Sequence, residues 1–225
     1  MTMQIKTSST HSSQNFKGRR ADIKDAQDIC RAVRNNFPYI SYSKAACEAS
    51  NKILKKEDIY NYIIKMNNTL KSYREDRQFI RTPFNFYKEV IYSTVKAKVA
   101  ACYDLAVLAE MIMKMNGVKN CGKTGLITSN GDRINHCVAY VQLGKKFDAE
   151  KIIIIDPWLQ EVDFLKNMHT KYNNQYRKYL TRKGVKDEIV FDFKKQWNLQ
   201  ENEIEQLREK YPQLIFKKAL FNAKK

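Results

Sequence analysis

Three side chains in this sequence have the chemistry of a thiol-based catalytic triad: Cys102, His136 and Asp156. A histidine beside a cysteine can take the thiol proton and later return it to a leaving group. A carboxylate on the second ring nitrogen fixes the tautomer and the orientation of the imidazole. The residues occur in the order Cys, His, Asp, at spacings of 34 and 20 positions. Their types and order indicate attack by a thiol on a carbonyl carbon.

The segment that follows Cys102 has the pattern of a buried helix. Residues 103–115 are apolar almost all round, and a helix of that kind belongs inside a core. Asn116-Gly117 is a typical helix end. In general, a helix N-terminus and an adjacent imidazolium lower the pKa of a thiol from its free value of ~8.5. The backbone N–H groups at such a helix start can also form part of an oxyanion hole.

The other two residues lie on segments that we expect to be strands. The strand patterns, separated by turn-forming residues, cover positions 124–128, 134–143 and 151–155. His136 is inside the second strand, and Asp156 directly follows the four isoleucines of the third. A helix start and two neighbouring strands would let the three residues converge on a rigid frame.

The rest of the chain indicates further helices and a mixed C-terminal part. We expect helices at 21–36 and 43–55, from residue 57, and from Thr82-Pro83, where Thr is a cap and Pro the first helical residue. After the third strand we expect an amphipathic stretch at 172–179, a strand at 189–193, a helix at 199–210 and a strand at 213–216. The fold class is therefore α+β, with helices first and then a mostly antiparallel sheet on one buried helix.

The length of 225 residues favours one domain. We expect a flexible polar tail at 1–18 and a single catalytic domain at 19–225. Within that domain, 19–98 is helical, 99–160 is the catalytic core and 161–225 is the C-terminal part. Hydrophobic residues make up 43% of the chain, which excludes a disordered protein.

The segments around the three residues resemble a known superfamily. ACYDLAVL at residues 101–108 and MNGV at 115–118 are similar to the nucleophile helix of transglutaminase-like, papain-fold proteins. NHCVAYV at 135–141 is similar to the histidine strand of that family, and IIIDP at 153–157 resembles its Asp-Pro motif. The likeness covers about residues 95–160. The Asp-Pro-Trp form at 156–158 also resembles that of bacterial toxins and effectors with this core, including deamidases and proteases.

The resemblance implies a papain- or transglutaminase-like core and a cysteine hydrolase. Cys102 would be the nucleophile, His136 the base and then the acid, and Asp156 the residue that orients His136. Such an enzyme needs neither a cofactor nor a metal ion. Deamidation of a Gln or Asn side chain in a host protein is the first expectation, and proteolysis or transglutamination by the same triad are alternatives.

Each of these residues also has a plainer interpretation. A lone cysteine in an apolar segment is usually a small buried hydrophobe, and we expect this of four cysteines: Cys30, Cys47, Cys121 and Cys137. Cys137 neighbours His136 in a strand, so its side chain should face the other way. Asp148 and Asp163 are less suitable than Asp156, because neither ends a buried strand. The odd number of cysteines without a Cys-x-x-Cys pair favours a reducing compartment.

The formal net charge of +17 indicates an anionic partner. The charge lies in the flanks: residues 1–98 have 19 basic and 9 acidic side chains, 99–160 have 7 and 6, and 161–225 have 15 and 9. We expect a protein substrate with an acidic surface. Peripheral membrane contact stays open, although no apolar run is long enough to span a bilayer.

The alternative of another class is a non-enzymatic basic module that binds nucleic acid or an anionic membrane. No nucleic-acid-binding motif supports it. Aromatic and basic residues do mix at 172–179, where they could stack on bases, but such a run is more often the solvated face of a helix. The N-terminus is polar and lacks a Sec-type signal peptide. We therefore expect a cytoplasmic protein, or one exported by another route and delivered into a host cell.

Overall fold

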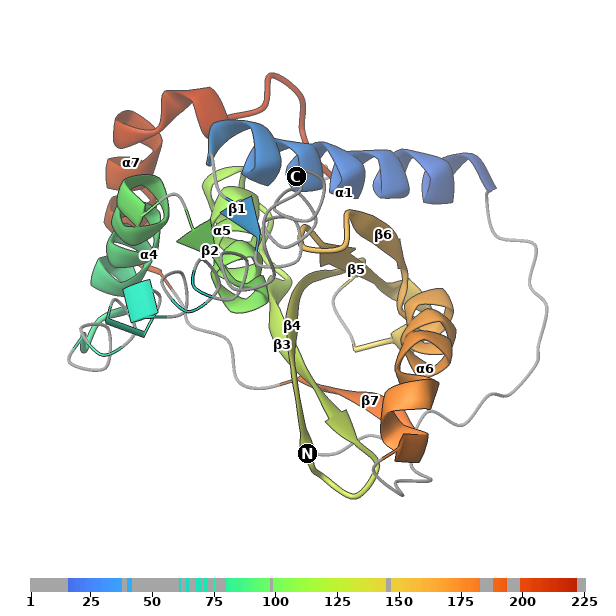
Figure 1. Cartoon of the computed structure of the whole chain (residues 1–225). Helices are drawn as coiled ribbons and strands as arrows, with labels where there is room; N and C mark the ends of the chain where they lie inside the picture. Colours follow the sequence, from blue (N-terminus) through green and yellow to red (C-terminus); the bar gives the residue numbers. More distant parts are fainter. Residues whose placement is uncertain are drawn as a thin grey trace, which may run out of the picture.

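Helix α5 (Cys102–Met115) is the element around which the other elements pack (Figure 1). All of its residues from 104 to 115 are buried. The sheet covers one side of it, and helices α1 (Phe16–Asn36), α4 (Pro83–Ala97) and α7 (Glu201–Lys210) pack around the rest. A helix that is apolar on every face is stable only in such surroundings.

The computed structural model describes most of the chain from residue 16 to residue 221. The described positions are 16–37, 40–41, 61, 64, 68, 69, 71, 72, 75, 80–97, 99–144, 147–182, 188–193 and 199–221.

Five antiparallel strands form the main sheet, in the order β6-β5-β4-β3-β7. Their bounds are β3 Cys121–Thr128, β4 Arg133–Gln142, β5 Ile152–Asp156, β6 Glu161–Phe164 and β7 Ile189–Asp192. A separate parallel pair joins β1 (Ile40–Ser41) to β2 (Val99–Ala100). The remaining elements are α6 (Leu165–Arg182) and the 3-10 turns η1 (Ala149–Lys151) and η2 (Pro212–Leu214).

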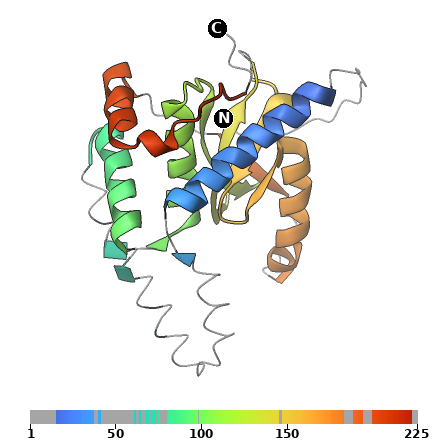
Figure 2. The same cartoon turned by 90° about the horizontal axis from the view of Figure 1, so that it is seen from above.

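The two faces of the sheet belong to two different cores. Ala139, Val141, Ile153 and Ile155 face α5 and pack with α1 and α4. The alternate residues of the same strands, Val138, Tyr140, Ile152 and Ile154, pack instead with α6. Helix α6 therefore lies across the sheet from α4 and α7, as both views show (Figure 2). The run of four isoleucines is buried throughout because β5 has a core on each side.

Glu110 and Lys114 are charged groups that are buried along α5, and they are paired. Glu110 Oε2 accepts a hydrogen bond from Lys123 Nζ of β3 at 3.1 Å, and Lys114 Nζ lies 3.7 Å from Glu110 Oε1. A buried carboxylate without such partners would be strongly destabilising. The Lys123 pair links the middle of α5 to the sheet, and the Lys114 pair lies within the helix.

The α+β class with an antiparallel sheet is confirmed. The helix expected at 21–36 begins earlier, at Phe16, inside the expected tail. The helix expected from Thr82-Pro83 is α4, and Asn85 N donates to Thr82 Oγ1 at 3.3 Å, as the cap requires. Helix α5 ends before Gly117, whose φ is +77°, a conformation that glycine tolerates.

The helices expected at 43–55 and from residue 57 lie mostly outside the described residues. Residues 43–55 lie outside the described residues. From residue 57 onward, positions 61, 64, 68, 69, 71, 72 and 75 are described, and all are helical.

The C-terminal half differs from expectation in three places. The strand expected at 213–216 is wrong, because Pro212 starts the 3-10 turn η2 and the chain then runs irregularly. Strand β6, a short edge strand with two acidic residues, was not expected from the pattern. Helix α6 covers 18 residues, far more than the amphipathic stretch at 172–179.

Among the described helices, none is both long and apolar enough to cross a membrane.

The packing of α5 predicts a large loss of stability when its buried side chains are shortened. Leu108 is fully buried on α5, so Leu108→Ala should lower the free energy of unfolding by about 2–5 kcal/mol through lost burial and the cavity left behind. Val95→Ala is the control, because Val95 is a helical residue that is 46% exposed, and it should change stability by less than about 0.5 kcal/mol. Denaturant unfolding measures both, and equal effects would contradict this packing.

Candidate active site

The Asp156 carboxylate is fully buried at the end of β5 and accepts hydrogen bonds on both oxygens. Its Oδ1 accepts from the backbone N–H groups of Trp158 and Leu159, at 3.0 and 3.1 Å. Its Oδ2 lies 2.6 Å from His136 Nε2 and accepts from the Tyr172 hydroxyl at 2.6 Å. The turn after β5 therefore holds one oxygen, and side chains from β4 and α6 hold the other.

His136 stands in an irregular part of β4. Gly125 of β3 pairs with Cys137 and the next β3 residue, Leu126, pairs with Ile134. Between these pairs β4 has two residues, Asn135 and His136, and β3 has none. Such bulges commonly re-aim a side chain beside a functional site. The imidazole is buried, with its ring edge-on to that of Tyr172 at a centroid distance of 5.7 Å.

The Cys102 thiol reaches the same imidazole from the first turn of α5. Cys102 interacts with His136 and raises the pKa of the imidazole. Asp156 occupies Nε2 of the ring, which leaves Nδ1 as the nitrogen available to the thiol. The sulfur also lies 3.9 Å from the backbone oxygen of Asn135, and the side chain is half-buried. The structure thus brings Cys102, His136 and Asp156 together in the order that the sequence predicts.

Asp104 fixes the backbone where α5 begins. Its Oδ2 accepts a hydrogen bond from the N–H of Ala101 at 2.8 Å, and the carboxylate is fully buried. An acidic residue in the first turn also interacts favourably with the helix dipole. This contact holds the residue that precedes Cys102 against the helix.

The surroundings of His136 favour its protonated form. Burial alone would lower the pKa of the imidazole, but the hydrogen bonds and charges of Asp156 and Cys102 outweigh it and raise the pKa to about 9. His136 would therefore carry a proton at neutral pH. An imidazolium next to a thiol stabilises the thiolate, which is the nucleophilic form of cysteine.

The other described cysteines are in environments that oppose ionisation. Burial raises the pKa of Cys30 to about 11 and that of Cys121 to about 12. The pKa of Cys137 is raised to about 12, first by burial and then by the charge of Cys102. Cys137 directly follows His136 in β4, where successive side chains alternate between the two faces of the sheet. Cys47 lies outside the described residues.

Two tyrosines of α6 face the site, and the sequence did not identify them. Tyr172 is fully buried, so its assignment to a solvated helix face or a base-stacking surface is wrong. Tyr176, one turn further on, is half-buried, and its pKa is raised to about 12 by burial and then by the charges of Asp156 and Cys102. The apolar spacing of Leu165, Met168 and Tyr172 was the available signal, because it marks one face of a helix.

Helix α1 supports the turn that follows Asp156. Arg34 Nη1 donates to the backbone oxygen of Pro157 at 3.4 Å. With its amide oxygen toward α1, Gln160 accepts from the same guanidinium at 2.8 and 3.1 Å. Gln160 has a φ of +62°, a conformation that a non-glycine residue keeps only when its surroundings hold it.

The less suitable acidic candidates have other roles in the structure. Asp148 caps the turn η1 through Glu150 N and pairs with Lys151. Asp163 Oδ1 accepts from Phe164 N and from the Asn167 side chain, at the start of α6. Both carboxylates therefore serve local turns.

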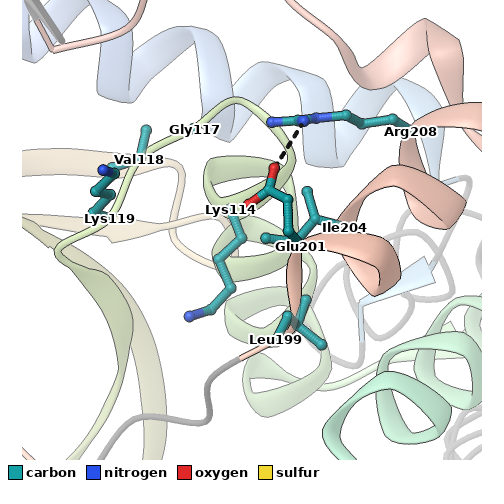
Figure 3. Close-up of a pocket in the computed structure, with 8 residues that line it drawn as sticks. All are labelled: Lys114, Gly117, Val118, Lys119, Leu199, Glu201, Ile204 and Arg208. Atoms are coloured by element: carbon teal, nitrogen blue, oxygen red, sulfur yellow. Dashed lines mark hydrogen bonds and ion pairs between the residues drawn. The ribbon is translucent and has the colours of Figure 1, made fainter. Parts of the chain in front are cut away.

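A surface pocket of about 440 Å³ lies at the other end of α5 (Figure 3). It is lined by Lys114, Gly117, Val118, Lys119, Leu199, Glu201, Ile204 and Arg208. Cys102 and Lys114 are separated by twelve helical positions, which is about 18 Å along the axis. This pocket is therefore distinct from the site at Cys102.

Within the described part of the chain, no group of three His, Cys, Asp or Glu side chains is placed to hold a metal ion. Comparisons of the chain with protein-family models, with curated proteins and with solved structures gave no match.

The contacts of His136 predict its titration. Nitrogen NMR of the imidazole should show the protonated form above pH 7 and a midpoint near pH 9. In Cys102→Ala the midpoint should fall, because the thiol contribution is lost, yet stay above the ordinary 6.5 because Asp156 remains. A midpoint at or below 6.5 in the unaltered protein would contradict the pairing.

The same shift sets how His136 affects stability. The folded-state pKa lies above the unfolded value, so binding of the proton favours the folded state. This contribution is complete below about pH 6.5 and is lost as the pH rises through about 9.

Proposed function

We propose that this protein is a cysteine hydrolase that acts on amide groups of a protein substrate through Cys102, His136 and Asp156, on a papain- or transglutaminase-like core. The observation that carries the proposal is the convergence of the three side chains. His136 has Asp156 on Nε2 at 2.6 Å and interacts with Cys102, whose thiol stands at a helix N-terminus.

In the first half of the reaction, the Cys102 sulfur attacks the carbonyl carbon of the substrate amide. The C–S bond forms as the carbonyl π electrons move to oxygen, and backbone N–H groups at the start of α5 can stabilise that negative charge. His136 then gives its proton to the amide nitrogen. The C–N bond breaks, and ammonia or an amine leaves a thioester on Cys102.

In the second half, water attacks the thioester carbon while His136 takes its proton. The C–S bond breaks, and the acid leaves. Asp156 keeps the imidazole in the orientation and tautomer that both proton transfers need. If a lysine amine replaces water, the product is a cross-link, so the same residues serve deamidation, proteolysis and transglutamination.

Deamidation of a Gln or Asn side chain is the preferred reaction, on the resemblance of the triad segments to effector deamidases. The net charge of +17 supports an acidic partner surface, because charge of this kind steers encounter. Delivery of the protein into a host cell is part of the same proposal.

The test of the reaction compares the protein with Cys102→Ala on whole host-cell extracts, followed by mass spectrometry. We expect Gln or Asn residues of one or a few proteins to become acids with the unaltered protein and none to do so with Cys102→Ala. The substitution removes the nucleophile but little packing at the half-buried helix start. New chain termini would indicate proteolysis, and Gln–Lys links would indicate transglutamination. Equal products from both proteins would refute Cys102 as nucleophile.

The contribution of Asp156 is tested by cysteine alkylation. With limiting iodoacetamide at pH 6, Cys102 should be labelled well before Cys30, Cys121 and Cys137, which are largely protonated there. Asp156→Asn should slow this labelling and reduce turnover by about 10²–10⁴-fold, because a neutral amide does not stabilise the imidazolium and its NH₂ group would face hydrogen-bond donors at one of the two oxygen positions. His136→Ala should cost as much as loss of the thiol. Unchanged labelling in both variants would mean that no thiolate–imidazolium pair exists.

A further inference from the structure

Tyr172 makes a contact with the candidate site that a packing residue does not need. Its hydroxyl donates to Asp156 Oδ2 at 2.6 Å, and that oxygen is the one that His136 Nε2 contacts, also at 2.6 Å. The tyrosine is fully buried, and its ring lies edge-on to the imidazole. Burial and the charge of Asp156 raise the pKa of the hydroxyl, so it stays protonated and remains a donor.

Two donors on one carboxylate oxygen compete for its charge. A hydrogen bond from a hydroxyl to a carboxylate is strong because the acceptor is ionised. The more of the negative charge the Tyr172 hydroxyl neutralises, the less remains to stabilise a proton on His136. The two contacts therefore oppose each other electrostatically, while both restrict the position of the carboxylate.

We propose that Tyr172 is a positioning residue of the catalytic site. Its hydroxyl holds the Asp156 carboxylate in place and weakens the stabilisation that this carboxylate gives to the proton on His136. The inference rests on the proposed function. The inference adds to that function a role for α6 in proton transfer, because His136 must release its proton to the leaving nitrogen. An imidazolium that is bound too firmly is a poor acid near neutral pH.

The groups that face His136 come from three neighbouring elements. Asp156 comes from β5, Cys102 from α5 and Tyr172 from α6, with Tyr176 one turn beyond Tyr172. Cys137 follows His136 in β4 but belongs to the other face of the strand. Among the described side chains, Tyr172 is the one besides His136 that donates to Asp156 Oδ2. Its removal therefore alters the carboxylate without removing a charge from the site.

The test measures the His136 titration by nitrogen NMR in Tyr172→Phe. Loss of the hydroxyl should raise the imidazole pKa by roughly half a unit to one unit, or about 3- to 10-fold in proton affinity. Tyr140→Phe is the matched control, because Tyr140 is a buried tyrosine of the same core that packs against Phe193. It should leave the His136 titration unchanged.

A second variant covers the case in which Tyr172→Phe does not fold. Site-specific 3-fluorotyrosine at position 172 keeps the ring and makes the hydroxyl a stronger donor, so the His136 pKa should fall. Opposite shifts in the two variants, or the fall alone where only the fluorinated protein folds, support the proposal. An unchanged titration, or a shift equal to that in Tyr140→Phe, overturns it.

This measurement is independent of any substrate. If the extract experiment shows no Cys102-dependent product while the His136 titration shifts as expected, the proposed function fails and the link between Tyr172 and His136 stands. If products form but the titration does not respond, Tyr172 is only a packing residue. A loss of stability in Tyr172→Phe without a change in the His136 pKa has the same meaning.

Discussion

A carboxylate that is wholly removed from water must be compensated by nearby donors, and Asp156 places this requirement on much of the molecule. Its four hydrogen bonds come from the turn after β5, from β4 and from α6. Arg34 of α1 holds this turn through a hydrogen bond to the backbone oxygen of Pro157. Elements far apart in the sequence are thus fixed relative to one another by one acidic side chain, and the imidazole takes its orientation from the same set.

Helix α5 supplies the other fixed point. It is buried on every side, and the pair of Glu110 with Lys123 of β3 connects it to the sheet. The hydrogen bond from the Ala101 N–H to Asp104 fixes the first turn of the helix as well. A nucleophile mounted there needs little rearrangement before it attacks, which is the usual advantage of a preorganised site.

Much of this arrangement could be predicted from the sequence, because the signals were local. The apolar run after Cys102, the strand pattern around His136 and the isoleucines before Asp156 each specify an element. The apolar spacing of α6 marks Tyr172 as a core-facing residue, but its hydrogen bond to Asp156 could not be predicted, because it depends on how α6 docks on the sheet. Strand β6 carries Glu161 and Asp163 and forms only because β5 offers an edge, whereas Pro212 overrode the strand pattern after it.

The two unpaired residues of β4 make the strand unequally tolerant of length changes. His136 and Cys137 point to opposite sides of the sheet because residues alternate along a strand. An insertion or deletion of one residue just before His136 would fall in the bulge, and the pairing from Cys137 onward would keep the imidazole in place. The same change just after His136 would invert the alternation and turn the ring toward α5. Insertions or deletions of one codon before this histidine should therefore preserve the position of its ring, whereas those after it should not.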